Sequence, residues 1–200
     1  MRLGITFRET MTGPFALGET DPTAGEAAGK RANTELSMHA AVEIGDLDRF
    51  VADQTHAGAI SGEIDFLPFG KGIQADRGVF RLFSPGGTTN LRLMVYELGF
   101  SHGGEAYYLA GQKHVQNDHA GTDLWNDTTT LYAKLHKGTD TTGQVVGAGV
   151  LRLGIPDLAR LTSTIRVLNA AKASDHARAL GEFGRFFMGN LWETYGPKRT

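Results

Sequence analysis

The stretch ELSMHAAVEI, Glu35–Ile44, decides the fold class because its apolar and polar side chains alternate along the chain. The apolar members occupy every second position: Leu36, Met38, Ala40, Val42 and Ile44. A period of two residues is that of an extended strand with one face against a core and the other against water. The stretch therefore predicts a half-buried β-strand.

Less regular runs of the same kind follow on both sides, separated by turn-forming residues. Glycine accounts for 27 of the 200 residues, above the usual fraction of about 7%, and glycine suits chain reversals. Further strands are predicted at residues 3–9, 15–18, 59–66, 72–83, 91–100, 106–115, 128–136 and 145–153. About nine strands in succession, without helices between them, predict a mainly β fold, an antiparallel β-sandwich or barrel.

The end of the chain has a different period. After Pro156, apolar residues recur at helical spacing, which predicts a helix to about residue 172. They are Leu158, Leu161, Ile165 and Leu168. Ser174 is a candidate N-cap for a second helix that reaches about residue 195. We therefore expect a C-terminal helical pair within residues 156–196, after a β body over residues 1–155.

The chain is expected to form a single domain, residues 1–200, because its length and its 40% hydrophobic content support one core and its composition does not shift. Within the β body, the segment ETDPTAGEAAGKRAN, residues 19–33, is small, polar and without an apolar period. Such a composition is typical of a loop. We therefore predict a mobile loop there.

Composition and charge exclude several classes of function. The 20 basic and 22 acidic side chains nearly balance, so nucleic acid and anionic membranes are not expected partners. The absence of cysteine excludes disulfides, thiolate metal sites and cysteine nucleophiles. No apolar run approaches 18 residues and no export signal is visible, so we expect a soluble, cytoplasmic protein without an integral membrane segment.

The stretch DLWNDTTTLYAKL, residues 123–135, places two carboxylates and three threonines ahead of a strand pattern. It could be an active-site cluster, but the residue types also suit a turn. Threonine is β-branched and favours extended backbone, and Asp127 can accept hydrogen bonds from nearby amides. We interpret the stretch as a turn into a strand.

No short catalytic motif is present: the nucleophile elbow, the paired-histidine zinc helix, the phosphate-binding loop and the dinucleotide fingerprint are all absent. His114 and His119 flank Asp118, but a spacing of five across a reversal does not suit metal ligands on one face. We therefore expect no metal and no cofactor, and assign no catalytic residue. If the protein is an enzyme, the groups to test are Tyr96, Tyr107, His114 and Asp127.

The final helix carries more apolar side chains than one packed face would use. Either the helix is wedged between the sheet and its neighbour, or part of it meets a partner chain or an apolar ligand. The residues predicted to line that contact are Phe183, Phe187, Leu191 and Trp192.

A series of short motifs extends over most of the chain. They are Phe7-x-Glu9-x-Met11-x-Gly13, Asp46-x-Asp48-x-Phe50, His56, Gly62, Gly78-x-Phe80-x-Leu82-Phe83, Met94-x-Tyr96, Gly111-x-Lys113 and Trp125-x-Asp127-Thr128-Thr129-x-Leu131. This series resembles an accessory β-rich domain of bacterial glucose-methanol-choline oxidoreductases, in particular cholesterol-oxidase-like proteins. The flavin-binding part has no counterpart here, so the resemblance implies an accessory or lipid-associated module and not an oxidase.

Three functions remain open. The leading hypothesis is a noncatalytic accessory module that binds a small apolar molecule, lipid- or steroid-like, or a partner protein. The second is a small β-barrel enzyme of the isomerase or cyclase type acting on an apolar substrate. The third is a structural subunit of a homo-oligomer, completed by the final helix. A buried, convergent acid and base in a closed pocket would favour the enzyme.

Overall fold

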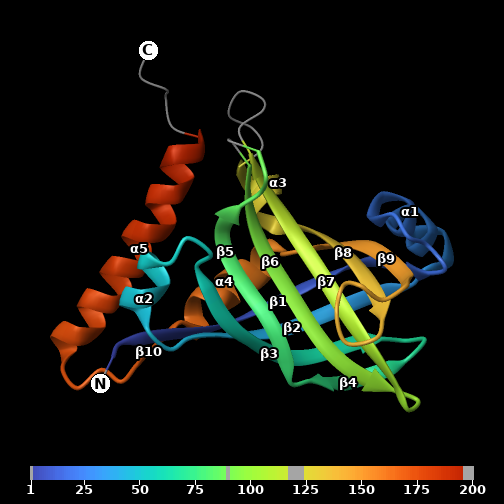
Figure 1. The fold of residues 1–200 in the computed structure, drawn as a ribbon, viewed down its shortest axis with the longest axis horizontal. Helices are drawn as coiled ribbons and strands as arrows, with labels where there is room; N and C mark the ends of the chain where they lie inside the picture. The colour runs from blue at the N-terminus through green and yellow to red at the C-terminus, as the bar shows by residue number, and fades with distance from the viewer. Residues whose placement is uncertain (1, 89–90, 117–123, 196–200) are drawn as a thin grey trace.

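Ten strands form one antiparallel sheet in the computed structural model, which describes residues 2–88, 91–116 and 124–195 (Figure 1). Eight of these strands close into a barrel. In chain order they are β1 (Gly4–Leu17), β2 (Glu35–Ile44), β3 (Ala57–Phe66), β5 (Arg77–Pro85), β6 (Leu91–His102), β7 (Glu105–Gln116), β8 (Thr130–Lys137) and β9 (Val145–Arg152). Each pairs with the next, and β9 returns to pair with β1. Because β9 pairs with β1, the sheet is a closed barrel and not a sandwich.

Closure of the barrel depends on the length of β1. Two separate strands were predicted, at residues 3–9 and 15–18, and Gly13 and Pro14, residue types common in chain reversals, lie between them. The structure has one continuous strand, whose first part pairs with β2 and whose last part pairs with β9. A Cβ at Gly13 would lie 2.1 Å from the carbonyl oxygen of Val150, so glycine is needed there for the two backbones to approach.

Two further strands extend the sheet beyond the barrel. The strand predicted at residues 72–83 is divided into β4 (Gly70–Ala75) and β5, and β4 pairs with β3. The second addition is β10 (Arg166–Leu168), which pairs with the beginning of β1. The first helix predicted at the C-terminus therefore ends earlier than residue 172.

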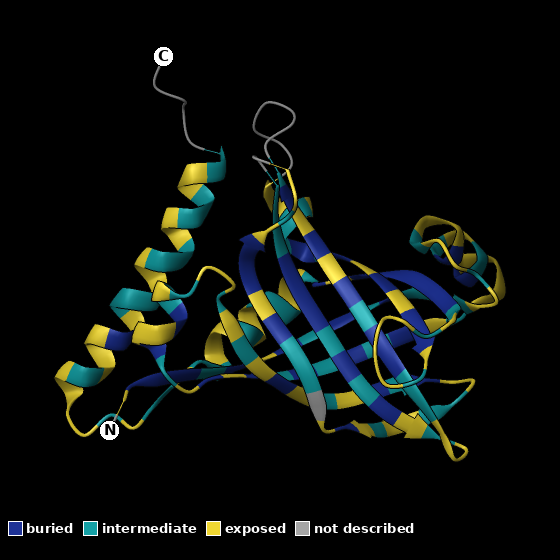
Figure 2. Ribbon diagram, viewed as in Figure 1, coloured by how far each residue is buried: buried dark blue, intermediate teal, exposed yellow. Residues whose placement is uncertain are grey.

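Apolar side chains fill much of the barrel interior. Buried and exposed residues alternate along the strands, as half-buried strands require (Figure 2). Phe66, Phe69, Phe100 and Tyr107 make a cluster of aromatic rings at the end of the barrel where β4 lies. The helices α3 (Leu124–Thr129), α4 (Ile155–Thr164) and α5 (Ala173–Tyr195) are associated with the opposite end (Figure 1).

The prediction of a loop at residues 19–33 is wrong, because this segment contains the helix α1 (Pro22–Ala32). Asp21 caps it by accepting hydrogen bonds from the amides of Thr23 and Ala24. The helix has no apolar period because it packs through glycine. A Cβ at Gly25 would lie 2.0 Å from the carbonyl oxygen of Ala148. Helix and sheet are thus too close for large side chains, and the usual sequence signal of a packed helix is missing.

The predicted C-terminal helical pair is present as α4 and α5. After α4 the chain turns into β10, with Ile165 as the C-cap residue of the helix. Ser174 lies inside the first turn of α5, and Asp175 accepts hydrogen bonds from the amides of Ala171 and Lys172 ahead of it. A further short helix, α2 (Leu47–Ala52), lies between β2 and β3.

The stretch at residues 123–135 enters a strand through a helical turn, and Asp123 lies outside the described residues. The hydroxyls of Thr128 and Thr129 donate to carbonyls one turn earlier in α3, and β8 begins at Thr130. Asp127 accepts hydrogen bonds from the amide of Gln116 and from the hydroxyl of Tyr195. This carboxylate thus joins α3 to the end of α5.

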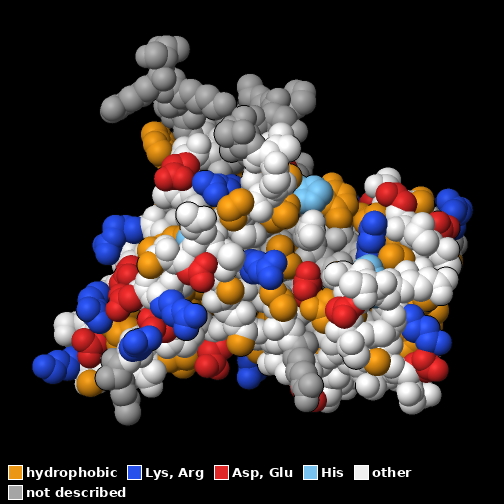
Figure 3. All heavy atoms as spheres, viewed as in Figure 1, with side chains coloured by type: hydrophobic (Ala, Val, Ile, Leu, Met, Phe, Trp, Pro, Cys, Tyr) orange, Lys and Arg blue, Asp and Glu red, His pale blue; other side chains and the backbone are white. Residues whose placement is uncertain are grey.

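The surface carries both signs of charge. On the face drawn in Figure 3, Lys and Arg side chains are interspersed with Asp and Glu, and neither sign dominates. Within the described part of the chain, no helix has the length and apolarity needed to cross a membrane.

Candidate functional site

A cavity of about 470 Å³ lies between the barrel interior and the three helices α3, α4 and α5. Its walls are mostly apolar. The barrel contributes Phe7, Phe80, Leu82 and Met94, and the helices contribute Leu124, Trp125, Leu158, Leu161, Phe183, Phe187 and Leu191. A volume of this size, lined by apolar and aromatic side chains with few polar groups, is typical of a small-molecule site.

Three polar side chains meet in the wall of this apolar cavity: Glu9, Tyr96 and Lys113. The Tyr96 hydroxyl donates to Glu9 Oε2 at 2.8 Å, and Lys113 Nζ donates to Glu9 Oε1 at 2.7 Å. A longer contact of 3.4 Å joins Lys113 Nζ to the Tyr96 hydroxyl. The side chains of Glu9 and Lys113 are each only 2% exposed, so the ion pair is screened from water. We call these three residues the buried polar triad.

The strand order explains why the triad forms. Glu9 is on β1, whereas Tyr96 and Lys113 are on β6 and β7. In the closed barrel, β1 and β6 are separated by three strands on either side, so they are opposite walls. An eight-stranded barrel is just narrow enough for side chains from opposite walls to touch. The register between β6 and β7 places Tyr96 close to Lys113, because Tyr96 pairs with Gly111, which is two residues before Lys113.

Burial determines the electrostatics of the triad. Desolvation, followed by the negative charge of Glu9, raises the pKa of Tyr96 well above its ordinary value of about 10, so this hydroxyl stays protonated as a donor. Lys113 Nζ also lies 4.8 Å from the centre of the Tyr96 ring, a cation–π distance. With Glu9 negative and Lys113 positive, the triad has no net charge.

The triad retains hydrogen-bonding capacity for a ligand. An ammonium group has three donors, and among the described residues Glu9 and Tyr96 are the acceptors for Lys113. One donor therefore remains. The carboxylate oxygens each accept one bond within the triad and have further lone pairs. The cavity thus presents one donor and some acceptor capacity within an apolar wall.

Of the four residues of α5 predicted to line a ligand or partner contact, three lie at this cavity, and the contact itself stays a prediction. Phe183, Phe187 and Leu191 line the cavity, and the Phe187 ring packs at 5.2 Å against Phe83 of the barrel. Trp192 does not join them, because it is 69% exposed on the outer side of α5. Helical geometry separates it from Phe187 and Leu191, which face the barrel.

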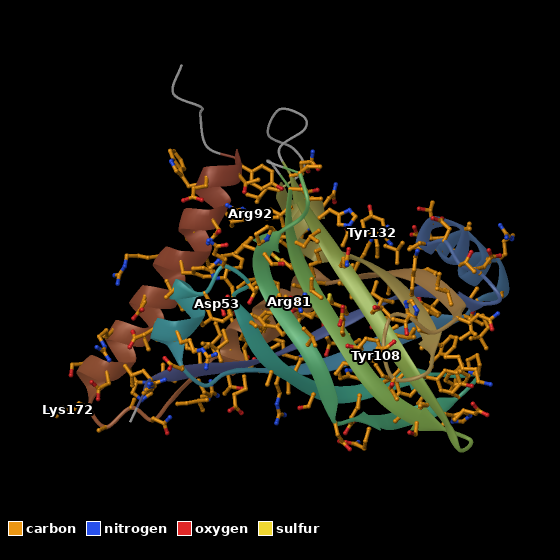
Figure 4. All side chains as sticks on the ribbon, in the orientation of Figure 1. Asp53, Arg81, Arg92, Tyr108, Tyr132 and Lys172 are labelled. Carbon is orange, nitrogen blue, oxygen red and sulfur yellow. The ribbon has the colours of Figure 1, made fainter. Side chains whose placement is uncertain are left out.

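The four residues proposed for an enzyme do not converge. Tyr96 belongs to the triad, but Tyr107 is in the aromatic cluster at the other end of the barrel. His114 stacks on Tyr132, which Figure 4 shows on the outer surface towards α1. Asp127 is bonded to Tyr195 and does not line the cavity.

Glu9 and Lys113 belong to the short motifs along the chain but were not predicted as site residues, although a signal was present. Along β1 the inward positions are Ile5, Phe7, Glu9 and Met11, so one acid interrupts an apolar row. Lys113 similarly stands two residues before the buried Val115. Each residue read alone suggests a solvated position, and only the strand alternation marks it as facing inward.

Other hollows have a different character. Two cavities of about 520 and 640 Å³ share Gln74 and Asp76 in their walls. Charged residues such as Arg8 also line the first, whereas the second is also lined by Phe100, Tyr107 and Tyr108. Among residues 2–88, 91–116 and 124–195, no group of three or more His, Asp or Glu side chains could hold a metal ion. Asp118 and His119 lie outside these ranges.

Known proteins give no indication of the function of this chain. No family model, no curated protein and no solved structure matches the chain.

Proposed function

We propose that the chain is a noncatalytic module that binds a small, uncharged, apolar molecule with one oxygen-containing group. Lipid- or steroid-like alcohols and ketones belong to this class. The observation that carries the proposal is the buried polar triad within a largely apolar cavity of about 470 Å³. The resemblance to accessory domains of flavoprotein oxidoreductases remains a prediction and is consistent with this role.

Electrostatics favour an uncharged ligand. A carboxylate placed near the triad would add a second negative charge beside Glu9, where little water can screen the repulsion. A hydroxyl or carbonyl oxygen adds no charge and can accept the remaining Lys113 donor. A hydrogen bond to a charged group contributes about 1.5–3 kcal/mol, and the surrounding rings add the apolar part of the affinity.

A matched ligand series tests this preference. Calorimetric titration with naphthalene, naphthol and naphthoate compares one ring system bearing no oxygen, a neutral hydroxyl and a carboxylate. We expect naphthol to bind about tenfold or more tightly than naphthalene, and naphthoate to bind most weakly. If none of the three binds, or if naphthoate binds most tightly, the proposal is wrong.

A pair of variants locates the binding. Leu161→Phe adds volume to a residue that lines the cavity, whereas Leu180→Phe adds it to an exposed position on α5. We expect the first variant to weaken naphthol binding and the second to leave it unchanged. Equal affinities in both variants would place the ligand elsewhere.

A second candidate function, an isomerase, is favoured by the 2.7 Å contact between an acid and a base in the same cavity. Such an enzyme would remove a proton next to a carbonyl group and return it at another carbon. Exchange of the α-protons of an apolar ketone for deuterium, followed by proton NMR with catalytic amounts of protein, tests this directly. If the α-protons exchange no faster than in buffer alone, the isomerase is ruled out and the binding function stands.

A further inference from the structure

The lysines of this chain differ sharply in their surroundings. Among the described residues, Lys113 is buried inside the barrel, whereas the other lysines are exposed: Lys30, Lys71, Lys134, Lys137 and Lys172. An amine is a nucleophile only in its neutral form, and enzymes that use lysine to attack carbonyl groups commonly place it in an apolar pocket. Lys113 is in such a pocket, with Glu9 and Tyr96 in contact with its Nζ.

We propose that Lys113 captures an apolar aldehyde or ketone as an imine. In this reaction Glu9 accepts and returns protons, and Tyr96 donates a hydrogen bond to the reacting oxygen. This inference rests on the proposed binding site and names the carbonyl compounds as the ligands that it would hold covalently. It adds a bond-forming step to what would otherwise be reversible binding.

The structure supplies the route for the first proton. Lys113 Nζ and Glu9 Oε1 are 2.7 Å apart, so a proton can pass directly from the ammonium to the carboxylate. This transfer turns two charges into two neutral groups, an exchange that water-poor surroundings make less costly. The amine is then free to attack the carbonyl carbon of a ligand in the cavity.

The remaining steps balance without another reactant. Attack forms the C–N bond and breaks the carbonyl π bond, and the proton on Glu9 passes to the carbonyl oxygen. The nitrogen, now positively charged, returns one proton to Glu9, which gives a neutral carbinolamine. The nitrogen lone pair then expels the hydroxyl group, which takes this proton back from Glu9 and leaves as water. The net change is ammonium plus carbonyl to protonated imine plus water. The imine N–H replaces one ammonium N–H as the donor to Glu9, so the ion pair is kept.

Tyr96 is placed to assist at the oxygen of the carbonyl group that Lys113 attacks. Its hydroxyl is bonded to Glu9 Oε2 and lies 3.4 Å from Lys113 Nζ, within reach of an oxygen bound to the carbon under attack. Burial raises the pKa of this hydroxyl, so it keeps its proton at neutral pH and can donate a hydrogen bond to that oxygen. The triad therefore contains a nucleophile, a proton acceptor and a hydrogen-bond donor in one contact network.

Reductive trapping tests the proposal. The protein is incubated with naphthaldehyde near pH 7, treated with cyanoborohydride, digested and mapped by mass spectrometry. We expect one naphthylmethyl group on Lys113, at about tenfold or higher occupancy than on any exposed lysine, since exposed amines are almost fully protonated at this pH. The absence of cysteine removes thiol addition as a competing reaction. Excess naphthol should prevent modification of Lys113 and leave the slow background on the other lysines.

Variants separate chemistry from folding. Glu9→Gln retains the amine but lacks the proton acceptor, and it should slow trapping by about 10²-fold or more. Lys134→Arg removes an exposed lysine and should change nothing at Lys113. If Glu9→Gln does not fold, competition by naphthol in the unchanged protein still decides whether the modification occurs in the cavity.

The outcomes for binding and for trapping are distinct. Naphthol binding with no selective modification of Lys113 overturns the imine and leaves the proposed function intact. Failure of both naphthol binding and trapping overturns the site itself. Modification that is selective for an exposed lysine, or that naphthol does not suppress, places the reaction outside the ligand cavity and also overturns the inference.

Discussion

Lys113 Nζ lies 2.7 Å from Glu9 Oε1 across the interior of the barrel, between strands that are not neighbours in the sheet. Both side chains are buried, and the contact ties the walls formed by β1 and β7. Desolvation of two charges usually offsets much of their attraction. The pair is therefore expected to contribute little net stability, which is in line with the proposed role in ligand binding.

Removing one charge of this pair should be worse than removing both. Glu9→Leu or Lys113→Met leaves a buried charge without its partner, which costs about 3–5 kcal/mol of unfolding free energy. The double variant leaves two apolar side chains and should lose much less than the sum of the single losses. Urea unfolding measures the free energy of unfolding of the two single variants and of the double variant. If the loss in the double variant equals the sum of the two single losses, the two residues are not coupled.

An exposed ion pair provides the comparison. Lys137 Nζ lies 3.1 Å from Glu105 Oε2, and both side chains are about half exposed. Glu105→Gln should change the unfolding free energy by less than about 1 kcal/mol. A larger loss there than in the buried pair would show that burial does not govern these contacts.

Glycine should be essential in α1 and unfavourable in α5. At Gly29 an added Cβ would lie 2.4 Å from the backbone nitrogen of Phe15, whereas at Gly184 it would meet nothing within 4 Å. We expect Gly29→Ala to push α1 away from the barrel and to destabilise the protein by more than about 1 kcal/mol. Gly184→Ala should stabilise α5 by up to about 1 kcal/mol through helix propensity. Thermal unfolding compares the two, and hydrogen exchange in Pro22–Ala32 shows whether α1 has loosened.

The burial of Tyr96 predicts a loss of stability at alkaline pH. Because its pKa is raised in the folded state, the unfolded chain releases this proton first. The stabilising effect is complete below about pH 10, the ordinary pKa of tyrosine, and is lost as pH rises above it, by up to about 1.4 kcal/mol per pH unit. The difference in unfolding free energy between the unchanged protein and Tyr96→Phe should therefore shrink as the pH rises from about 10 to 11. A difference that stays constant over this range would contradict the burial of the hydroxyl.

Trp192 and Phe187 should behave differently although both are aromatic residues of α5. Phe187 lines the cavity and packs on Phe83, so Phe187→Ala should cost about 1.5–3 kcal/mol and weaken naphthol binding. Trp192 is 69% exposed, and Trp192→Gln should change stability by about 0.5 kcal/mol or less and leave binding unchanged. Light scattering on the same variant tests the homo-oligomer hypothesis, because a drop in mass with unchanged folding would place Trp192 at an interface.

Local patterns predicted much of the architecture. The alternation in Glu35–Ile44 is that of β2, and its apolar members are buried as expected. Pro156 and the apolar spacing after it marked α4 to within one residue of its beginning. The errors lie where packing replaces pattern, as in α1, whose contact with the sheet uses Gly25 and Gly29 and so leaves no apolar stripe to read.

The candidate site divides in the same way. Four residues of α5 were predicted to line a contact because a helix with excess apolar side chains must bury them against something, and three of the four line the cavity. Glu9 and Lys113 could not be paired, since 104 positions separate them and their meeting depends on how the barrel closes.

Strand and helix periods and composition are local properties, so the mainly β class, the β body, the two C-terminal helices and the lack of cysteine could all be read from the chain alone. The closure of the sheet, and the meeting of Glu9, Tyr96 and Lys113 inside it, became apparent only in the folded molecule. Closure brings opposite walls within side-chain reach, and that distance is set by strand number and register. A charged residue read from its neighbours looks solvated, and its burial becomes visible only when the strand that faces it is known.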